Sequence, residues 1–303
     1  MKTKHVLIFV AIVWSWIGVS SPGAFAAIAN EQKPEPCTAF KDFATAYNFI
    51  KNAKVLEIPE KKTIDIAKKI AAGCTGSAGR FIMVAEVLSK AGVQAGDSVA
   101  LGIEFATKTN EQTEVFTSLF KKAFVAEGFD LTAQVSIRLA KRIALKPDVA
   151  PKILLSDFDK LADFCIKEKG LPLPKPECAN LIERLLTESG PSQGSAADAF
   201  LTAYRFTSGS DPGANFTAHD AVGVSEQLVK TSADTVEDFI ESYKFGVSTN
   251  GLSLPRAQAL ALAQELAALT VAKSVVEVEA KPALQPKVTP PQALKDSKEK
   301  TKP

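Results

Sequence analysis

Four cysteines and one histidine are the side chains best suited to metal binding or nucleophilic catalysis outside the first 26 residues. A structural zinc site needs clustered thiolate or imidazole ligands, and no two cysteines have the C-x₂₋₄-C spacing typical of such sites. A catalytic His219 would need a serine to activate and a carboxylate to orient the imidazole, yet no G-x-S-x-G motif accompanies it. The sequence therefore predicts no catalytic, metal-binding or cofactor-binding residue, and a His219 exposed on the surface.

Paired carboxylates are the remaining route to catalysis. Glycoside hydrolysis requires only two suitably placed Asp or Glu residues, and their separation in space is not visible in a sequence. Sugar-binding sites usually offer aromatic platforms, but both tryptophans, Trp14 and Trp16, lie in the first 26 residues. A glycan-active or other hydrolase that uses acidic residues stays an alternative to a non-enzymatic protein.

Residues 1–26 have the three parts of a cleavable signal peptide. Lys2 and Lys4 precede a short apolar stretch, and Ala24 and Ala26 fit an A-x-A cleavage site. The apolar stretch is shorter than the roughly 20 residues that a membrane-spanning helix needs. We therefore expect an exported protein, in a periplasm or in the medium, that is not an integral membrane protein.

Removal of the signal peptide leaves a chain without net charge. The 36 basic residues of the whole chain fall to 34 without Lys2 and Lys4, against 34 acidic residues. Nucleic-acid binding relies on an excess of positive charge that neutralises phosphates. Nucleic acid is therefore excluded as an expected partner.

A repeat organises the rest of the chain. Six stretches of fourteen residues align without a gap, beginning at residues 58, 93, 131, 173, 216 and 254. At 100° per residue their apolar and small positions cover an arc of roughly 160°, which indicates a helix that is packed on two sides. The opposite arc is predicted to be a solvated face and carries the charged residues Asp65, Lys68, Lys69, Arg138, Lys141, Arg142, Glu183 and Arg184.

A second predicted helix precedes each fourteen-residue stretch. A phenylalanine is expected to open each of these helices, at Phe43, Phe81, Phe116, Phe158, Phe200 and Phe239. The turns between the two helices often contain glycine, and proline often follows, as suits the end of one helix and the start of the next. The repeating unit is therefore a helical hairpin.

The hairpins predict an all-α protein organised as a right-handed array of about six hairpins. In general shape this array resembles the HEAT and armadillo class of α-solenoids, in which each hairpin buries its apolar faces against its neighbours. A compact all-α bundle and a closed α/α toroid are the alternatives. The expected segments are a signal peptide at 1–26, a lead-in at 27–42, six hairpins at 43–272, and a disordered tail rich in proline and lysine at 273–303.

The hairpin register selects one disulfide pairing among the three that four cysteines allow. Cys37 precedes the first helix of hairpin one and Cys74 follows its second helix, so the two lie at neighbouring ends of an antiparallel pair. Cys165 and Cys178 lie on either side of the turn of hairpin four. In an exported protein we therefore expect Cys37–Cys74 and Cys165–Cys178 bonds.

Three tyrosines share one column of the repeat. Tyr47, Tyr204 and Tyr243 each come four residues after the first phenylalanine of a hairpin, and Phe120 occupies this column in hairpin three. The spacing favours core packing, and a row of amphipathic rings that contact a partner is the alternative.

These features predict an exported, non-enzymatic interaction or scaffold protein. Its partner would be another protein or a component of the cell envelope, because a helical-repeat surface needs no chemical motif to bind. A structural envelope protein and a hydrolase of α/α-toroid type are the alternatives. The oligomeric state is not predicted.

Overall fold

The computed structural model describes residues 37, 39–53, 56, 58–166, 170–190, 194–210 and 213–279, with side chains up to residue 269. All of the helices belong to one unit, which covers residues 38–303. The expected signal peptide at 1–26 and the tail from residue 280 onward lie outside the described residues.

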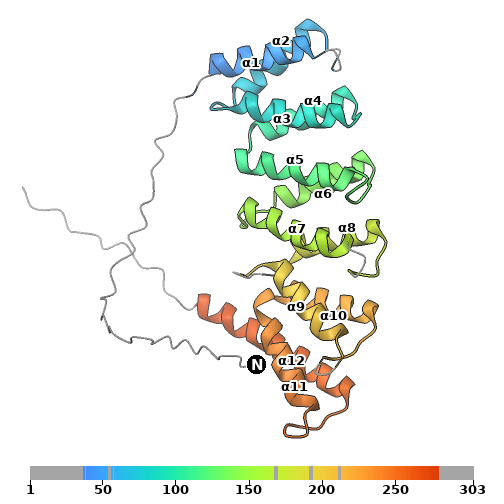
Figure 1. Ribbon diagram of the computed structural model, residues 1–303. Coiled ribbons are helices and arrows are strands. Elements are labelled where there is room, and N and C mark those ends of the chain that lie inside the picture. Colours follow the sequence, from blue (N-terminus) through green and yellow to red (C-terminus); the bar gives the residue numbers. More distant parts are fainter. Residues whose placement is uncertain are drawn as a thin grey trace, which may run out of the picture. The chain divides into compact units, whose positions relative to one another are not determined.

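Within the described part of the chain the fold is all-α, as predicted, with twelve α-helices, one short 3₁₀ helix at Ala233–Thr235 and no strand (Figure 1). The α-helices are α1 (Ala39–Asn52), α2 (Glu60–Ala71), α3 (Ser77–Lys90), α4 (Ala95–Ala106), α5 (Asn110–Phe124), α6 (Ala133–Ala144), α7 (Pro151–Ile166), α8 (Lys175–Glu188), α9 (Ala196–Ser208), α10 (Ala218–Thr231), α11 (Val236–Val247) and α12 (Arg256–Glu279). Each fourteen-residue stretch of the repeat thus contains most or all of one even-numbered helix, or its first part in the case of α12.

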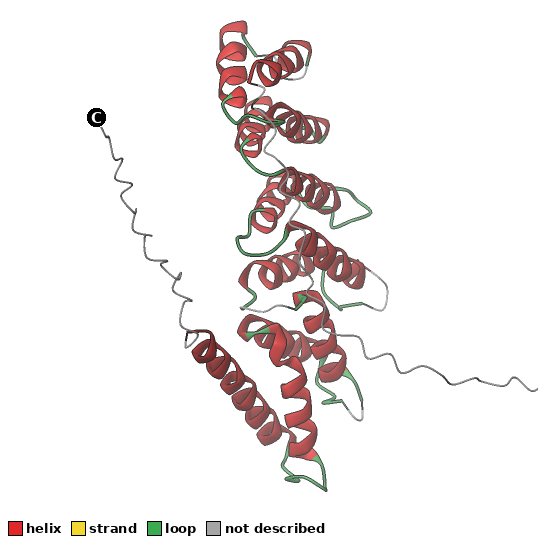
Figure 2. Cartoon of the chain, turned by 90° about the vertical axis from the view of Figure 1, so that its left-hand side faces the viewer, coloured by secondary structure: helices red, strands yellow, loops and turns green. Residues whose placement is uncertain are grey.

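Consecutive helices pack in pairs, from α1 with α2 to α11 with α12. Each odd-numbered helix, the first helix of its hairpin, also contacts the next odd-numbered helix along the chain. The even-numbered second helices make similar contacts, as between α6 and α8 or α8 and α10. The hairpins therefore follow one another in space in the order of the chain (Figures 1 and 2).

The phenylalanine column forms the centre of each hairpin. Five of its six rings have no exposed surface, namely Phe81, Phe116, Phe158, Phe200 and Phe239. The expectation that these residues open their helices is wrong, because each helix begins three to seven residues earlier. At two of these helices a capping residue marks the start: Thr109 and Gln112 form a capping box before α5, and the Ser195 side chain accepts a hydrogen bond from the backbone N–H of Asp198 at α9.

Both ends of the predicted array are displaced. Helix α1 begins at Ala39 rather than at residue 43, and α12 continues to Glu279, past the expected start of the tail at Lys273. The segment Lys273–Glu279 contains no proline, since the first proline beyond it is Pro282, so its backbone can continue the helix.

Two disulfides join cysteines of the chain, as the sequence predicts. Cys165 near the end of α7 is bonded to Cys178 in the first turn of α8, with the two Cα atoms 6.2 Å apart. Cys37 and Cys74 are disulfide-bonded as well, and no cysteine is free. The Cys165–Cys178 bond closes the hairpin of α7 and α8 across its turn.

Two buried aspartates connect successive first helices, although the repeat pattern does not predict these contacts. Asp42 in α1 accepts a 3.0 Å hydrogen bond from the backbone N–H of Ala78, the second residue of α3. Asp157 in α7 accepts hydrogen bonds from the Ser195 hydroxyl at 2.6 Å and from the N–H of Ala197, the second residue of α9, at 3.4 Å. Each carboxylate thus satisfies donors at the start of the next hairpin, where helix N–H groups lack partners within the helix.

Candidate binding groove

The surface of the second helices, here the second-helix face, is crossed by ion pairs between hairpins. Lys141 of α6 contacts Glu104 of α4 at 2.7 Å. Arg142 of α6 contacts Glu183 of α8 at 2.6 Å. Arg184 of α8 contacts Glu226 of α10 at 2.6 and 2.9 Å. In each case the twelfth position of one fourteen-residue stretch pairs with the eleventh position of the next.

This arrangement corrects the prediction that these charges only face solvent. Glu183 is 5% exposed, because it lies between α6 and α8 and is covered by Arg142. Asp65, Lys68 and Lys69 of α2 are exposed as expected. The pattern of a single helix indicates only a charged arc. The three ion pairs follow from comparing the neighbouring copies of the repeat that they join, in which charges of opposite sign occupy the twelfth position of one copy and the eleventh of the next.

The Arg184–Glu226 pair predicts a dependence of stability on pH. The Glu226 carboxylate accepts hydrogen bonds from Arg184, which has the larger effect, and from Lys230. Both hold the pKa of the Glu226 carboxyl below its ordinary value. A carboxyl whose pKa is lower in the folded chain binds fewer protons there than in the unfolded chain. Its contribution to the free energy of unfolding is therefore complete above the unfolded pKa and is lost as the pH falls through the folded pKa. We expect wild type to exceed Glu226→Gln by about 1 kcal/mol in free energy of unfolding at pH 7, and the difference to shrink as the pH falls below the ordinary pKa of a glutamate. Urea unfolding of both proteins across this range measures it, and a difference that is constant with pH would contradict the assignment.

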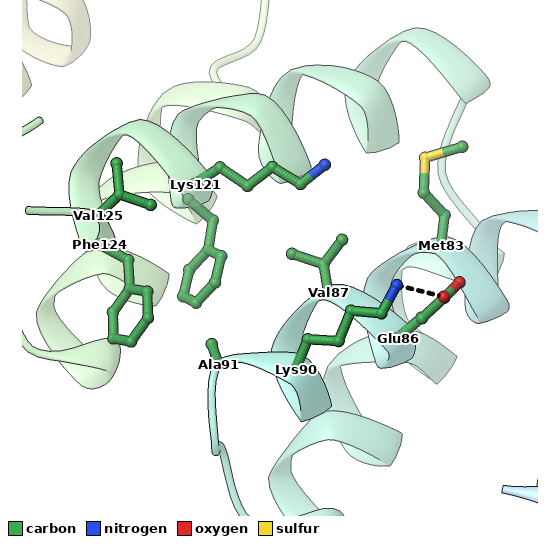
Figure 3. Close-up of a pocket in the computed structure, with 9 residues that line it drawn as sticks. Met83, Glu86, Val87, Lys90, Ala91, Lys121, Phe124 and Val125 are labelled. Atoms are coloured by element: carbon green, nitrogen blue, oxygen red, sulfur yellow. Dashed lines mark hydrogen bonds and ion pairs between the residues drawn. The ribbon is translucent and has the colours of Figure 1, made fainter. Parts of the chain in front are cut away.

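The surface of the first helices, here the first-helix face, has a different character because apolar side chains are exposed on it. A groove of about 390 Å³ lies between α3 and α5 (Figure 3). Phe120 and Phe124 of α5 stack at one side of it, with ring centroids 5.6 Å apart. Val87 of α3 lies across from these rings, and Met83 and Val125, 37% and 41% exposed, line the edges.

Three charged side chains border the groove. The Lys90 ammonium donates a 2.7 Å hydrogen bond to Glu86 one turn earlier in α3, and the two form an ion pair. Lys121 extends from α5 and is exposed (Figure 3). Its ammonium makes no ion pair or hydrogen bond with any residue that the structure describes. The groove therefore combines an apolar lining with one positive charge that is not neutralised.

The three tyrosines named from the sequence do not line this groove. Tyr204 and Tyr243 are 8% and 1% exposed and stack on Phe200 and Phe239 one turn before them. Tyr47 is partly buried, and its hydroxyl donates a 3.1 Å hydrogen bond to Glu60 of α2. The rings of Tyr204 and Tyr243 thus belong to the core of their hairpins.

The groove is not predicted by the repeat pattern, although the sequence carries one signal for it. Phe120 occupies the tyrosine column in hairpin three, and Phe124 follows one turn later on the same side of α5. The opposite side of the groove comes from α3, more than 30 residues earlier, and only the folded chain brings it close.

The remaining predictions from the sequence concern His219, possible metal ligands and possible membrane-spanning helices. His219 is exposed in the first turn of α10. Over the described ranges, no group of three His, Cys, Asp or Glu residues is arranged to hold a metal ion. None of the helices that the structure describes is both long and apolar enough to cross a membrane.

Comparison with known proteins gives no relative. The chain matches no protein-family model, no curated protein and no solved structure.

Proposed function

We propose that this is an exported, non-enzymatic helical-repeat protein that binds another protein, in the cell envelope or outside the cell, through its first-helix face. The observation that carries this proposal is the unequal distribution of exposed large apolar side chains. Nine are exposed among the described residues; Leu266 and Leu269 lie on α12 and Leu252 in the turn before it, while none lies on α2, α4, α6, α8 or α10. The other six gather on the first helices, five on the helices themselves and one directly after α5. The six are Phe40, Met83, Val125, Ile153, Ile166 and Phe245.

The contacts between consecutive hairpins support an open, right-handed α-solenoid. Such arrays present extended surfaces for binding, and exposed apolar side chains gathered on one surface are typical of interaction sites. Glu104, Glu183 and Glu226 of the second-helix face each pair with lysine or arginine, which supports a role in joining hairpins rather than in hydrolysis.

Two observations support export. All four cysteines are disulfide-bonded, and disulfides persist mainly in oxidising compartments. The sequence of residues 1–26 has the pattern of a signal peptide. A periplasmic protein and a secreted one both agree with these observations.

Matched variants of the full chain test the proposal. Met83→Glu and Phe245→Glu place a charge on the first-helix face, and Ala100→Glu and Gln227→Glu do so at exposed positions of α4 and α10. In affinity capture from the source organism's envelope and medium, we expect a protein that wild type and both second-helix variants retain. Its recovery should fall by about tenfold or more with either first-helix variant.

Thermal unfolding of each variant checks that the fold is kept. Equal recovery by all five proteins, or equal loss with Ala100→Glu, would contradict the proposal. So would the absence of any protein that wild type retains above a blank resin.

A further inference from the structure

We propose that the groove between α3 and α5 is a docking site for an extended segment of a partner protein, one that presents apolar side chains next to a carboxylate. This inference rests on the proposed function and specifies the kind of partner. It combines two features of the groove, its apolar lining and the unpaired charge of Lys121.

The apolar lining selects the side chains of the occupant. Phe120 and Phe124 form one wall and Val87 and Ala91 the other, so the interior offers no polar side chain to bind. Phe120 is already buried in its wall, at 1% exposed, so apolar side chains of a partner would remove mainly Phe124, Val87 and Ala91 from water. Burial of apolar surface is the main driving force of protein association. An extended segment can place its alternate side chains into an open groove of this kind.

The charge at the rim selects a carboxylate. Lys90 already contacts Glu86 at 2.7 Å, whereas Lys121 has no charged neighbour of opposite sign within bonding distance among the described residues. A carboxylate placed beside Lys121 would gain a charge-assisted hydrogen bond at the edge of an apolar surface. An arginine or lysine at this point would instead be repelled, so the charge also discriminates between segments.

Two other occupants fit less well. The chain's own tail at residues 280–303 carries six lysines against two acidic residues, so its charge has the same sign as that of the groove. A fatty acid would supply a carboxylate and an apolar chain, but such ligands favour enclosed pockets. Met83 and Val125 at the edges are exposed, and the groove belongs to a face with further exposed apolar side chains. A protein surface covers such a face better than a single acyl chain does.

Selection from a displayed library of random peptides on the full wild-type chain tests this inference. We expect the enriched peptides to combine Leu, Ile, Phe or Met with a nearby Asp or Glu. An enriched peptide, labelled and measured by fluorescence polarisation, should bind Lys121→Glu and Met83→Glu about tenfold or more weakly than wild type.

Lys69→Glu is the matched control, since Lys69 and Lys121 are both exposed lysines in the last turn of their helices. It changes the net charge equally and should alter the affinity by less than about twofold. Lys121→Gln is a milder variant that should weaken the peptide less than Lys121→Glu. Circular dichroism confirms that each variant is folded.

Several outcomes would overturn the inference. These are enriched peptides without carboxylates, equal weakening by Lys69→Glu, and no enrichment at all. Binding of oleate that Met83→Glu abolishes, with no peptide selected, would assign the groove to an acyl chain instead. If a native partner is captured through the first-helix face but Lys121→Glu does not affect it, this inference fails while the proposed function stands.

Discussion

Replacement of Phe116 by alanine is expected to lower the free energy of unfolding by about 3–5 kcal/mol. The Phe116 ring has no exposed surface and lies 4.4 Å, between centroids, from that of Phe105 in the preceding hairpin. It also stacks on Phe120, which lines the groove. The variant therefore loses apolar burial and leaves a cavity between two hairpins that cannot close without moving a helix.

Phe40→Ala is the matched control for this prediction, because the Phe40 side chain is 83% exposed. Its effect should stay within about 0.5 kcal/mol. Urea unfolding followed by circular dichroism measures both changes. Similar losses in the two variants would show that the phenylalanine column is not the centre of the hairpins.

Asp157→Ala is expected to cost about 2–3 kcal/mol of the free energy of unfolding. The Asp157 carboxylate is 3% exposed and accepts hydrogen bonds from the Ser195 hydroxyl and from the N–H of Ala197, which is itself buried. The substitution removes the acceptor of both donors at the start of α9. Asp157→Asn keeps one carbonyl oxygen as an acceptor and should therefore cost less than Asp157→Ala.

Asp159→Ala, two residues further along α7, is the control. The Asp159 side chain is 43% exposed and pairs with Lys122 on the surface, a contact that contributes about 0–1 kcal/mol. Thermal unfolding of the three variants ranks them. An equal effect of Asp157→Ala and Asp159→Ala would contradict the role assigned to Asp157 in joining hairpins four and five.

Much of the fold follows from the sequence because each hairpin is a local structure. The period of the apolar positions locates the helices, and the register of the repeat brings Cys165 and Cys178 together across a turn. The starts of the first helices were misplaced, since the buried phenylalanine marks a face of the helix and not its end. At α5 the start is set by Thr109, whose hydroxyl caps the helix seven residues before Phe116.

The contacts between hairpins were not predicted. Asp42 and Asp157 each precede a phenylalanine of the repeat and resemble ordinary first-turn residues of a helix, but each binds the backbone of the next hairpin 36 to 40 residues away. The sequence pattern indicates an exposed charge at Glu183, whereas in the structure Glu183 lies between α6 and α8 and pairs with Arg142. The groove also depends on contacts between hairpins, because one of its walls belongs to the hairpin of α3 and the other to the hairpin of α5.

The central claim is that the first-helix face binds a partner protein, and site-specific photo-crosslinking tests it most directly. A photoreactive amino acid would replace Met83 at the groove or Ala100 on the second-helix face, in the full chain produced in its own host. We predict a crosslinked protein from position 83 and none from position 100. Crosslinking from position 100 alone, or to the same extent from both positions, would contradict the claim.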